Sequence, residues 1–229
     1  MEFRRGIRDG IPIALGYLSV SFTFGLMAVS AGLTVWQATL ISLLNLTSAG
    51  QFAGLGIMAA SGGFLEMALA QFIINLRYSL MSIAVSQKSD ETMTTPARLA
   101  IGFGITDEIF AVSTGKNTSI GRNYMAGLIL TPVIGWTLGT LSGAAVGNIL
   151  PDIIADSLGI AIYGMFLAII IPPAKKDMRI VFVILVAAAI SCMIFYTPLS
   201  NVISSGFTVI ISAVVASALG AVFFPAEVK

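Results

Sequence analysis

Long apolar segments recur along the whole chain and constrain its fold more than any other feature. Only 10% of the 229 residues are charged, 57% are hydrophobic and the mean hydropathy is +0.96, whereas soluble domains carry about 25% charged residues. A helix needs about 20 apolar residues to cross a bilayer, and an open sheet cannot satisfy its backbone in lipid. The sequence therefore predicts an all-α integral membrane protein, a polytopic helical bundle of about eight spans. The predicted spans lie near residues 10–31, 35–60, 63–86, 97–114, 123–147, 157–171, 180–196 and 202–223.

The Lys and Arg residues between these segments predict how the spans are oriented. Cytoplasmic loops carry an excess of positive charge, and with the N-terminus inside the cell only Lys88 and Arg98 fall outside. We therefore expect all eight segments to cross, both termini to be cytoplasmic and residues 1–229 to form a single transmembrane domain. The expected cytoplasmic cations are Arg4, Arg5, Arg8, Lys116, Arg122, Lys175, Lys176, Arg179 and Lys229.

The composition excludes several kinds of chemistry. The chain has no histidine and one cysteine, Cys192, which excludes imidazole metal sites, histidine-based catalysis and an internal disulfide. The net charge of +1 comes without a basic patch, which argues against nucleic-acid binding. The chain also lacks the residue patterns of membrane-embedded proteases and metal enzymes. We therefore expect no cofactor, no metal site and no enzymatic activity.

Three charged residues lie deep inside predicted spans. Arg77 interrupts the apolar stretch QFIINLRYSL, and the helical rise places it roughly 13 Å deep, with Asp107 and Glu108 roughly 15 to 17 Å deep. Their two spans are consecutive and antiparallel, so we expect Arg77 to pair with Asp107 or Glu108 and the charges to face the protein interior. Glu66 lies near the expected cytoplasmic end of its span and is expected to reach water.

The excess of acids over arginines in this group suggests a role in proton coupling. Two adjacent carboxylates against one arginine leave either a net negative site or a proton on one acid. A carboxyl that binds and releases a proton is what proton coupling requires, so Asp107 and Glu108 are the candidates for that role. The alternative is a purely structural ion pair that holds two helices together.

Two predicted spans contain residues that weaken a helix. Residues 45–54, NLTSAGQFAG, combine two glycines with small polar side chains, and Gly102 and Gly104 precede the two acids. A break in a transmembrane helix exposes backbone N–H groups that can hold a substrate carboxylate. Alternatively, the small residues of 45–54 pack against a neighbouring helix and Gln51 is satisfied by a helix contact.

These features predict a polar chamber inside the membrane. Asn75 and Tyr78 share one stripe of span 63–86, next to the weakened helices and the charges. The candidate substrate-binding residues are Ser48, Gly50, Gln51, Asn75, Arg77, Tyr78, Asp107 and Glu108.

Glycines repeat at every fourth position in span 123–147. They form a bare ridge on which another backbone can pack closely. We consider this ridge as a contact for a partner subunit, with an internal helix contact as the alternative. The ridge consists of Gly135, Gly139, Gly143 and Gly147.

Several segments together resemble one protein family. The segments GIRDGIPIALGY, SAGQFAG, AQFIINLRYSLMS and ITDEIF, in this order and over nearly the whole chain, are similar to the AzlC-type large subunit of bacterial branched-chain amino acid exporters. The resemblance implies a permease of the bacterial inner membrane that exports valine, leucine or isoleucine. It also implies a small hydrophobic AzlD-type subunit with about four spans as the partner.

The residues and the resemblance together predict a secondary transporter in which the charged residues bind the substrate. We expect Arg77 to meet the substrate carboxylate, and Asp107 or Glu108 to meet the ammonium group or a counter-moving proton. Two alternatives remain open: a non-transporting assembly or sensor subunit, and a transporter of another small amphipathic solute.

Overall fold

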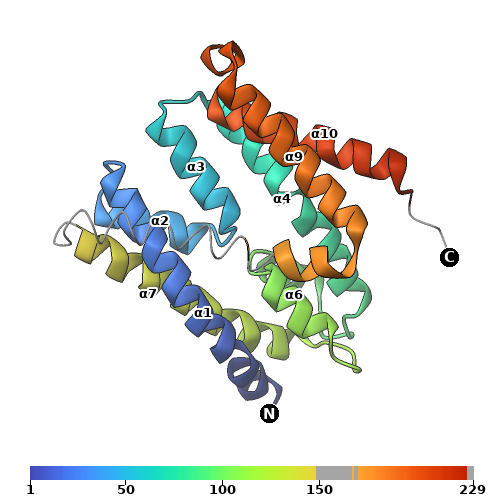
Figure 1. The fold of residues 1–229 in the computed structure, drawn as a ribbon. Helices are drawn as coiled ribbons and strands as arrows, with labels where there is room; N and C mark the ends of the chain where they lie inside the picture. Colours follow the sequence, from blue (N-terminus) through green and yellow to red (C-terminus); the bar gives the residue numbers. More distant parts are fainter. Residues whose placement is uncertain (148–166, 168–169, 226–229) are drawn as a thin grey trace. The chain divides into compact units, whose positions relative to one another are not determined.

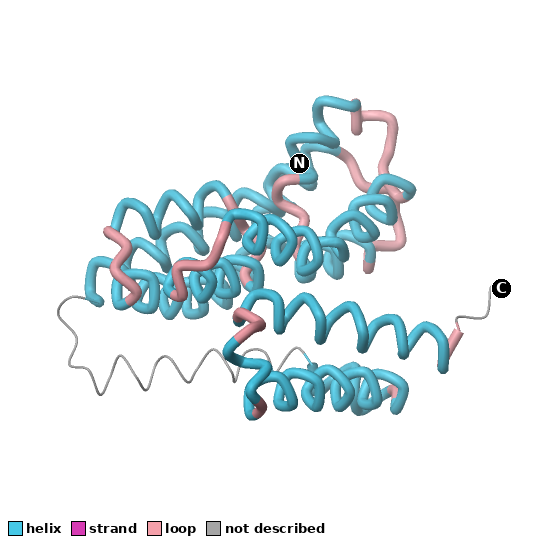
Figure 2. Tube along the Cα trace, turned by 90° about the horizontal axis from the view of Figure 1, so that it is seen from above, coloured by secondary structure: helices cyan, strands magenta, loops and turns pink. Residues whose placement is uncertain are grey.

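The described part of the chain is almost entirely helical. The computed structural model describes residues 1–147, 167 and 170–225, and Figure 2 shows helices and loops without strands along this trace. This confirms the all-α prediction for the described residues. The helices, labelled in Figure 1, are α1 (Glu2–Ser30), α2 (Val35–Leu44), α3 (Ala49–Ala59), α4 (Phe64–Gln87), α5 (Thr95–Gly102), α6 (Asp107–Thr114), α7 (Arg122–Gly147), α9 (Met178–Tyr196), the short 3-10 helix η1 (Pro198–Asn201) and α10 (Ser205–Phe223).

Five of these helices, α1, α4, α7, α9 and α10, are long and apolar enough to cross a membrane. They establish a multi-pass helical protein, but the predicted number of eight spans is not reached in the described residues. Segments 35–60 and 97–114 each form two short helices separated by a break. Most of segment 157–171 lies outside the described residues.

The chain divides into two compact units. Unit 1 consists of Met1–Gln51 and Asn75–Ala161, and unit 2 of Phe52–Ile74 and Ile162–Lys229. The boundaries fall inside α3 and α4, so these two helices belong to both units. The single transmembrane domain expected from the sequence remains a prediction.

Helices α1 and α7 form the centre of unit 1 and pack along almost their full length (Figure 1). A Cβ added to Gly135 would lie 2.5 Å from the carbonyl oxygen of Ala14, and Gly143 lies directly against the backbone of Phe22. Glycines of α1 complete the contact, because Gly6 faces Tyr124 near the start of α7 and Gly25 faces Thr140 towards its end. The two helices are therefore parallel and in close backbone contact.

This packing corrects the expected role of the glycine ridge. Gly135, Gly139 and Gly143 are buried and face α1, and Gly147 faces Leu26 of the same helix. The ridge is an internal helix contact, which was the alternative interpretation. It leaves no bare surface for a partner subunit at these positions.

The loops that follow α4 and α6 meet at one end of unit 1. The Lys88 ammonium donates to the carbonyl oxygens of Thr114 and Lys116. In the backbone, Ile120 donates to Lys88 over 3.0 Å and Asp90 donates to Ile120 over 3.1 Å. The segment that contains α5 and α6 therefore begins and ends at the same end of the unit. The prediction that residues 97–114 cross the membrane is wrong, because the break between α5 and α6 lets the chain turn back.

The N-termini of α1 and α7 lie at this same end. Asp9 of α1 pairs with Lys116 at 3.2 Å, and the Tyr124 hydroxyl donates to Asp9 over 2.9 Å. Helix α4 thus ends where α1 begins. Because α1 crosses once and α4 is long enough to cross back alone, the α2–α3 segment makes no net crossing. The predicted crossing of residues 35–60 is corrected in the same way.

The cations of unit 1 gather at this end. Lys88 and Arg98 were expected on the opposite side from the other cations. Both lie here, because Lys88 joins its loop to the loop after α6 and Arg98 of α5 donates to Ser86 in the last turn of α4. We call this end of unit 1 the basic end. Its cations are Arg4, Arg5, Arg8, Lys88, Arg98, Lys116 and Arg122.

In unit 2, α9 and α10 pack side by side in opposite directions, because the Phe182 ring near the start of α9 contacts Phe223 at 5.8 Å and Phe224 at 5.4 Å. Glu66 of α4 is 6% exposed and accepts hydrogen bonds from the Gly206 N–H, at 2.9 Å, and from the Ser204 hydroxyl. Its carboxylate satisfies the N-terminus of α10, where negative charge is favourable. The expectation that Glu66 reaches water is therefore wrong.

Candidate functional site

The break between α2 and α3 is built into the residues that form it. Asn45 is extended, with φ −145° and ψ 113°, and its side chain accepts a hydrogen bond from the Thr47 N–H at 3.1 Å. Ser48 adopts a left-handed conformation with φ 44°, which a non-glycine residue rarely takes outside turns and functional sites. The interruption leaves the Thr47 carbonyl oxygen accessible to a side chain, and the Tyr78 hydroxyl of α4 donates to it over 3.4 Å.

The break between α5 and α6 has a different cause. Gly104 lies so close to Ile129 of α7 that an added Cβ would overlap its side chain. Thr106 is extended and immediately precedes α6. Asp107 and Glu108 then form the first turn of α6, where the positive end of the helix dipole favours carboxylates. The two acids are therefore placed by the start of a helix, which the sequence had placed in mid-span.

Arg77 of α4 forms an ion pair with Asp107, as the sequence predicted for one of the two acids. The guanidinium also donates to the Tyr78 hydroxyl at 3.2 Å and lies over the Tyr78 ring at 4.9 Å. The side chains of Arg77 and Asp107 are 40% and 36% exposed. The ion pair is therefore accessible at the surface of this chain.

Glu108 has a different partner, which the sequence did not reveal. It accepts a hydrogen bond from the Tyr17 hydroxyl of α1, and the same hydroxyl lies 2.6 Å from Thr106 Oγ1. Tyr17 is 8% exposed. A polar-tipped aromatic residue at the end of GIRDGIPIALGY was the available signal, because a buried Tyr hydroxyl usually has a hydrogen-bond partner.

Gln51 lies in a buried hydrogen-bond network. Its Oε1 accepts from Trp136 Nε1 at 2.8 Å and its Nε2 donates to Ser42 at 2.9 Å, while Ser42 and Thr140 are 2.6 Å apart. The Trp136 ring in turn packs edge-on against Tyr17, with centroids 5.2 Å apart. This is the helix contact that the sequence allowed as an alternative, and it positions the first residues of α3.

Two of the remaining candidates, Ser48 and Gly50, lie at the α2–α3 break, and Asn75 lies on α4. Ser48 is half-buried within it, and the Gly50 N–H donates to the Thr47 carbonyl oxygen over 3.2 Å. Asn75 is half-buried on α4, one turn before Tyr78. The structure thus joins Arg77 directly to Tyr78 and Asp107. Glu108 and Gln51 contact other residues.

Neighbouring residues of one helix therefore contact both breaks. Tyr78 contacts the Thr47 carbonyl at the first break and Arg77 contacts Asp107 at the second. A guanidinium, a hydroxyl, a carbonyl oxygen and a carboxylate meet within unit 1. Such groups can bind the carboxylate and ammonium groups of a zwitterion.

Helices interrupted at an ionisable pair define a multi-pass membrane protein of a kind consistent with a transporter-type role. The sequence pattern of the family described as AzlC protein matches residues 12–150. The chain belongs to the AzlC family.

Relatives of this chain are membrane proteins. It is 33% identical over 175 residues to an uncharacterized membrane protein of Archaeoglobus fulgidus, covering 76% of each chain. It is 26% identical over 222 residues to the inner membrane protein YgaZ of Escherichia coli, covering 92% of this chain and 91% of the relative. A Helicobacter pylori membrane protein is 25% identical over 154 residues, covering 64% and 67%. No solved structure matches the chain significantly.

Proposed function

We propose that this chain is the large subunit of a secondary transporter that exports branched-chain amino acids from the bacterial cytoplasm. The observation that carries the proposal is the position of Arg77 and Tyr78 between two interrupted helices. Transporters bind small charged substrates at such interruptions, where backbone groups and ionisable side chains are both accessible. Membership of the AzlC family supports the same class of function.

In the proposed mechanism, the substrate carboxylate competes with Asp107 for Arg77. A carboxylate that binds the guanidinium releases Asp107 from its cation, and the substrate ammonium group can then pair with the released carboxylate. A proton on Asp107 removes the charge that the ammonium group needs. Substrate and proton therefore compete for Asp107, which couples the exit of substrate to the entry of a proton.

The second acid has a separate part in this mechanism. Glu108 is bound to Tyr17 and not to Arg77, so it keeps its position when the ion pair opens. We assign it, together with Asp107, to the substrate ammonium group, with Tyr78 and the Thr47 carbonyl oxygen fixing the orientation. The proposal involves no catalytic reaction and no cofactor.

The basic end of unit 1 supports an orientation. All cations of unit 1 except Arg77 lie there, and the positive-inside rule places such an end in the cytoplasm. We propose that the N- and C-termini are cytoplasmic and that the protein lies in the inner membrane. In a Cys192→Ser background, Asp90→Cys and Asn117→Cys should both react with an impermeant maleimide only from the cytoplasmic side. Reaction from opposite sides would contradict the turn formed by α5 and α6.

A small hydrophobic AzlD-type subunit is the proposed partner. Exposed ionisable groups cannot face lipid without a large cost, and the Arg77–Asp107 pair is substantially exposed on this chain. A second subunit that covers this part of the protein would shield the pair from lipid, so that only water and substrate reach it. The glycine ridge is excluded as its binding surface because α1 already occupies it.

Export of labelled valine from proteoliposomes tests the proposal. The purified chain is reconstituted with and without the small subunit. An imposed proton gradient should then drive valine movement, including movement against the valine gradient. We expect full activity only with both subunits. If proteoliposomes with both subunits lose valine no faster than protein-free vesicles do, the proposed function is contradicted.

A further inference from the structure

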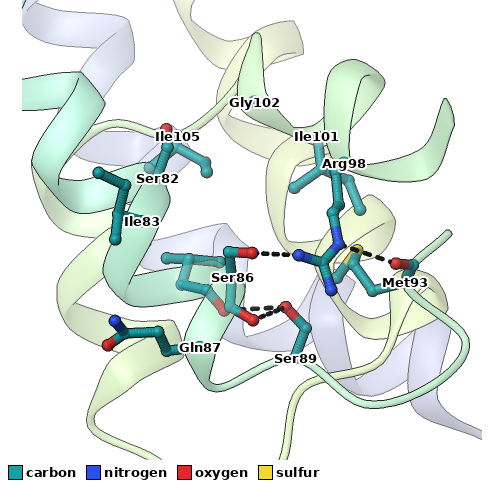
Figure 3. A pocket seen from close by; sticks show the side chains of 11 residues that line it. Ser82, Ile83, Ser86, Gln87, Ser89, Met93, Arg98, Ile101, Gly102 and Ile105 are labelled. Carbon is teal, nitrogen blue, oxygen red and sulfur yellow. Dashed lines mark hydrogen bonds between the residues drawn. The ribbon is translucent and has the colours of Figure 1, made fainter. Parts of the chain in front are cut away.

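Unit 1 contains a pocket of about 340 Å³ at its basic end, a volume in the range of small-molecule sites. It lies between the last turns of α4, the loop that follows α4, and α5 (Figure 3). Most of its wall is apolar. The aliphatic side chains in the wall are Ile83, Val85, Met93, Ile101 and Ile105.

Arg98 supplies the positive charge of this pocket. Its Nε donates to the Met93 carbonyl oxygen at 3.0 Å and its Nη1 donates to the Ser86 hydroxyl, as Figure 3 shows. Arg98 forms no ion pair with an acid in the described part of the chain. Asp90, in the loop that follows α4, accepts hydrogen bonds from the Thr92 hydroxyl and N–H. The guanidinium is therefore held in place while its charge has no anionic partner among these residues.

A polar stripe on α4 joins the pocket to the Arg77 site. Ser86 and Ser82 line the pocket, and Tyr78 follows at the same four-residue interval, so the three side chains lie along one face of the helix. Ile105 of the pocket wall lies two residues before Asp107. The pocket and the ion pair thus follow one another along α4, and Ile105 in the α5–α6 break lies between α5 of the pocket and Asp107 of α6.

We infer that this pocket is a loading site, in which Arg98 binds the carboxylate of a small aliphatic amino acid before it moves to Arg77. A guanidinium forms strong charge-assisted hydrogen bonds with a carboxylate, and the aliphatic wall receives a branched side chain. The serine hydroxyls accept hydrogen bonds from the ammonium group. The inference rests on the proposed function for the direction of movement, from the cytoplasm towards Arg77, but not for the chemistry of the pocket.

Protection of an engineered cysteine measures occupancy of the pocket directly. In a Cys192→Ser background, Ser82→Cys is labelled with a charged maleimide in detergent and in lipid nanodiscs. We expect valine and isovalerate, which both carry a carboxylate, to slow labelling. Valinol, which has the same side chain and an amino group but no carboxylate, should not. Ser89→Cys, at another position of the pocket wall, serves as the second labelling site.

Arg98→Gln should raise the valine concentration needed for half-protection about tenfold or more, as expected for loss of a charge-assisted contact. Arg98→Lys should recover part of the protection, since it keeps the charge but not the planar fork. Arg122→Gln removes the same charge from the same end without touching the pocket and should leave protection unchanged.

The outcomes separate this inference from the proposed function. Valine export without protection of either cysteine, or protection unaffected by Arg98→Gln, overturns the loading site and leaves the proposed function standing. Protection without export overturns the proposed function alone. Protection in nanodiscs that is independent of added valine and disappears in detergent would assign the pocket to a lipid headgroup and overturn the inference.

Discussion

The two interrupted segments of unit 1 differ in what their breaks present to the site. The α2–α3 break presents neutral groups, the Thr47 carbonyl oxygen and the left-handed Ser48. After the break, Gln51 in the first turn of α3 accepts a hydrogen bond from Trp136. The α5–α6 break presents Asp107 in the first turn of a helix, in contact with Arg77. In the proposed mechanism the first break is a fixed binding surface, and the second is the one whose charge state changes.

The largest effect is expected from the residue that links the ionisable break to α4. Arg77→Ala should lower valine export by at least about a hundredfold, because the substrate loses its carboxylate partner and Asp107 loses its cation. Labelled valine efflux from proteoliposomes measures this loss. Arg77→Lys keeps the charge without the planar fork and should retain intermediate activity. Wild-type export by Arg77→Ala protein would show that the α5–α6 break is not the binding site.

A change to the acid of the same break should affect coupling more than transport itself. Asp107→Asn cannot exchange a proton, so valine should equilibrate across the membrane without accumulating against its gradient. Efflux measured with and without an imposed proton gradient checks this. Glu108→Gln can still accept a hydrogen bond from Tyr17 and is the matched control. Loss of coupling in Glu108→Gln but not in Asp107→Asn would exchange the roles assigned to the two acids.

A change at the neutral α2–α3 break should lower the stability of the protein more than its transport activity. Gln51→Leu leaves the Trp136 N–H without its acceptor in a buried place, which costs about 1–3 kcal/mol. We expect a lower thermal unfolding midpoint and a nearly unchanged KM for valine. Combining it with Trp136→Phe should cost less than the sum of the single changes, because both remove the same contact. A large rise in KM without a stability change would make the first break a direct binding site for substrate through Gln51.

The sequence predicted the components of the site because they violate the composition of a membrane span. A charge inside an apolar segment needs a partner, so Arg77 could be paired with Asp107 or Glu108 from their positions. Glycines and small polar residues in mid-span indicated both interruptions, because they weaken a helix. Tyr17 and Trp136 escaped notice, since an aromatic residue in an apolar helix gives no sign of which distant residue it contacts.

The direction of the helices could not be obtained in this way. Hydropathy measures whether a segment is long enough to cross, but a segment with a break can also turn back and still be equally apolar. The contact of Lys88 with Thr114 and Lys116, which joins loops far apart in the predicted topology, decides between the two. The two apparent exceptions to the charge asymmetry, Lys88 and Arg98, were the signal that the expected crossings were wrong.

Equilibrium binding of isovalerate tests most directly whether substrate displaces Asp107 from Arg77. Isovalerate has the branched chain and carboxylate of valine but no ammonium group, so in an Arg98→Gln background, which removes the carboxylate contact of the pocket, its affinity reports on the Arg77 guanidinium. If Asp107 competes for Arg77, adding Asp107→Asn to this background should make the protein in nanodiscs bind isovalerate several-fold to about tenfold more tightly. Unchanged or weaker binding by Asp107→Asn would show that the ion pair only joins two helices.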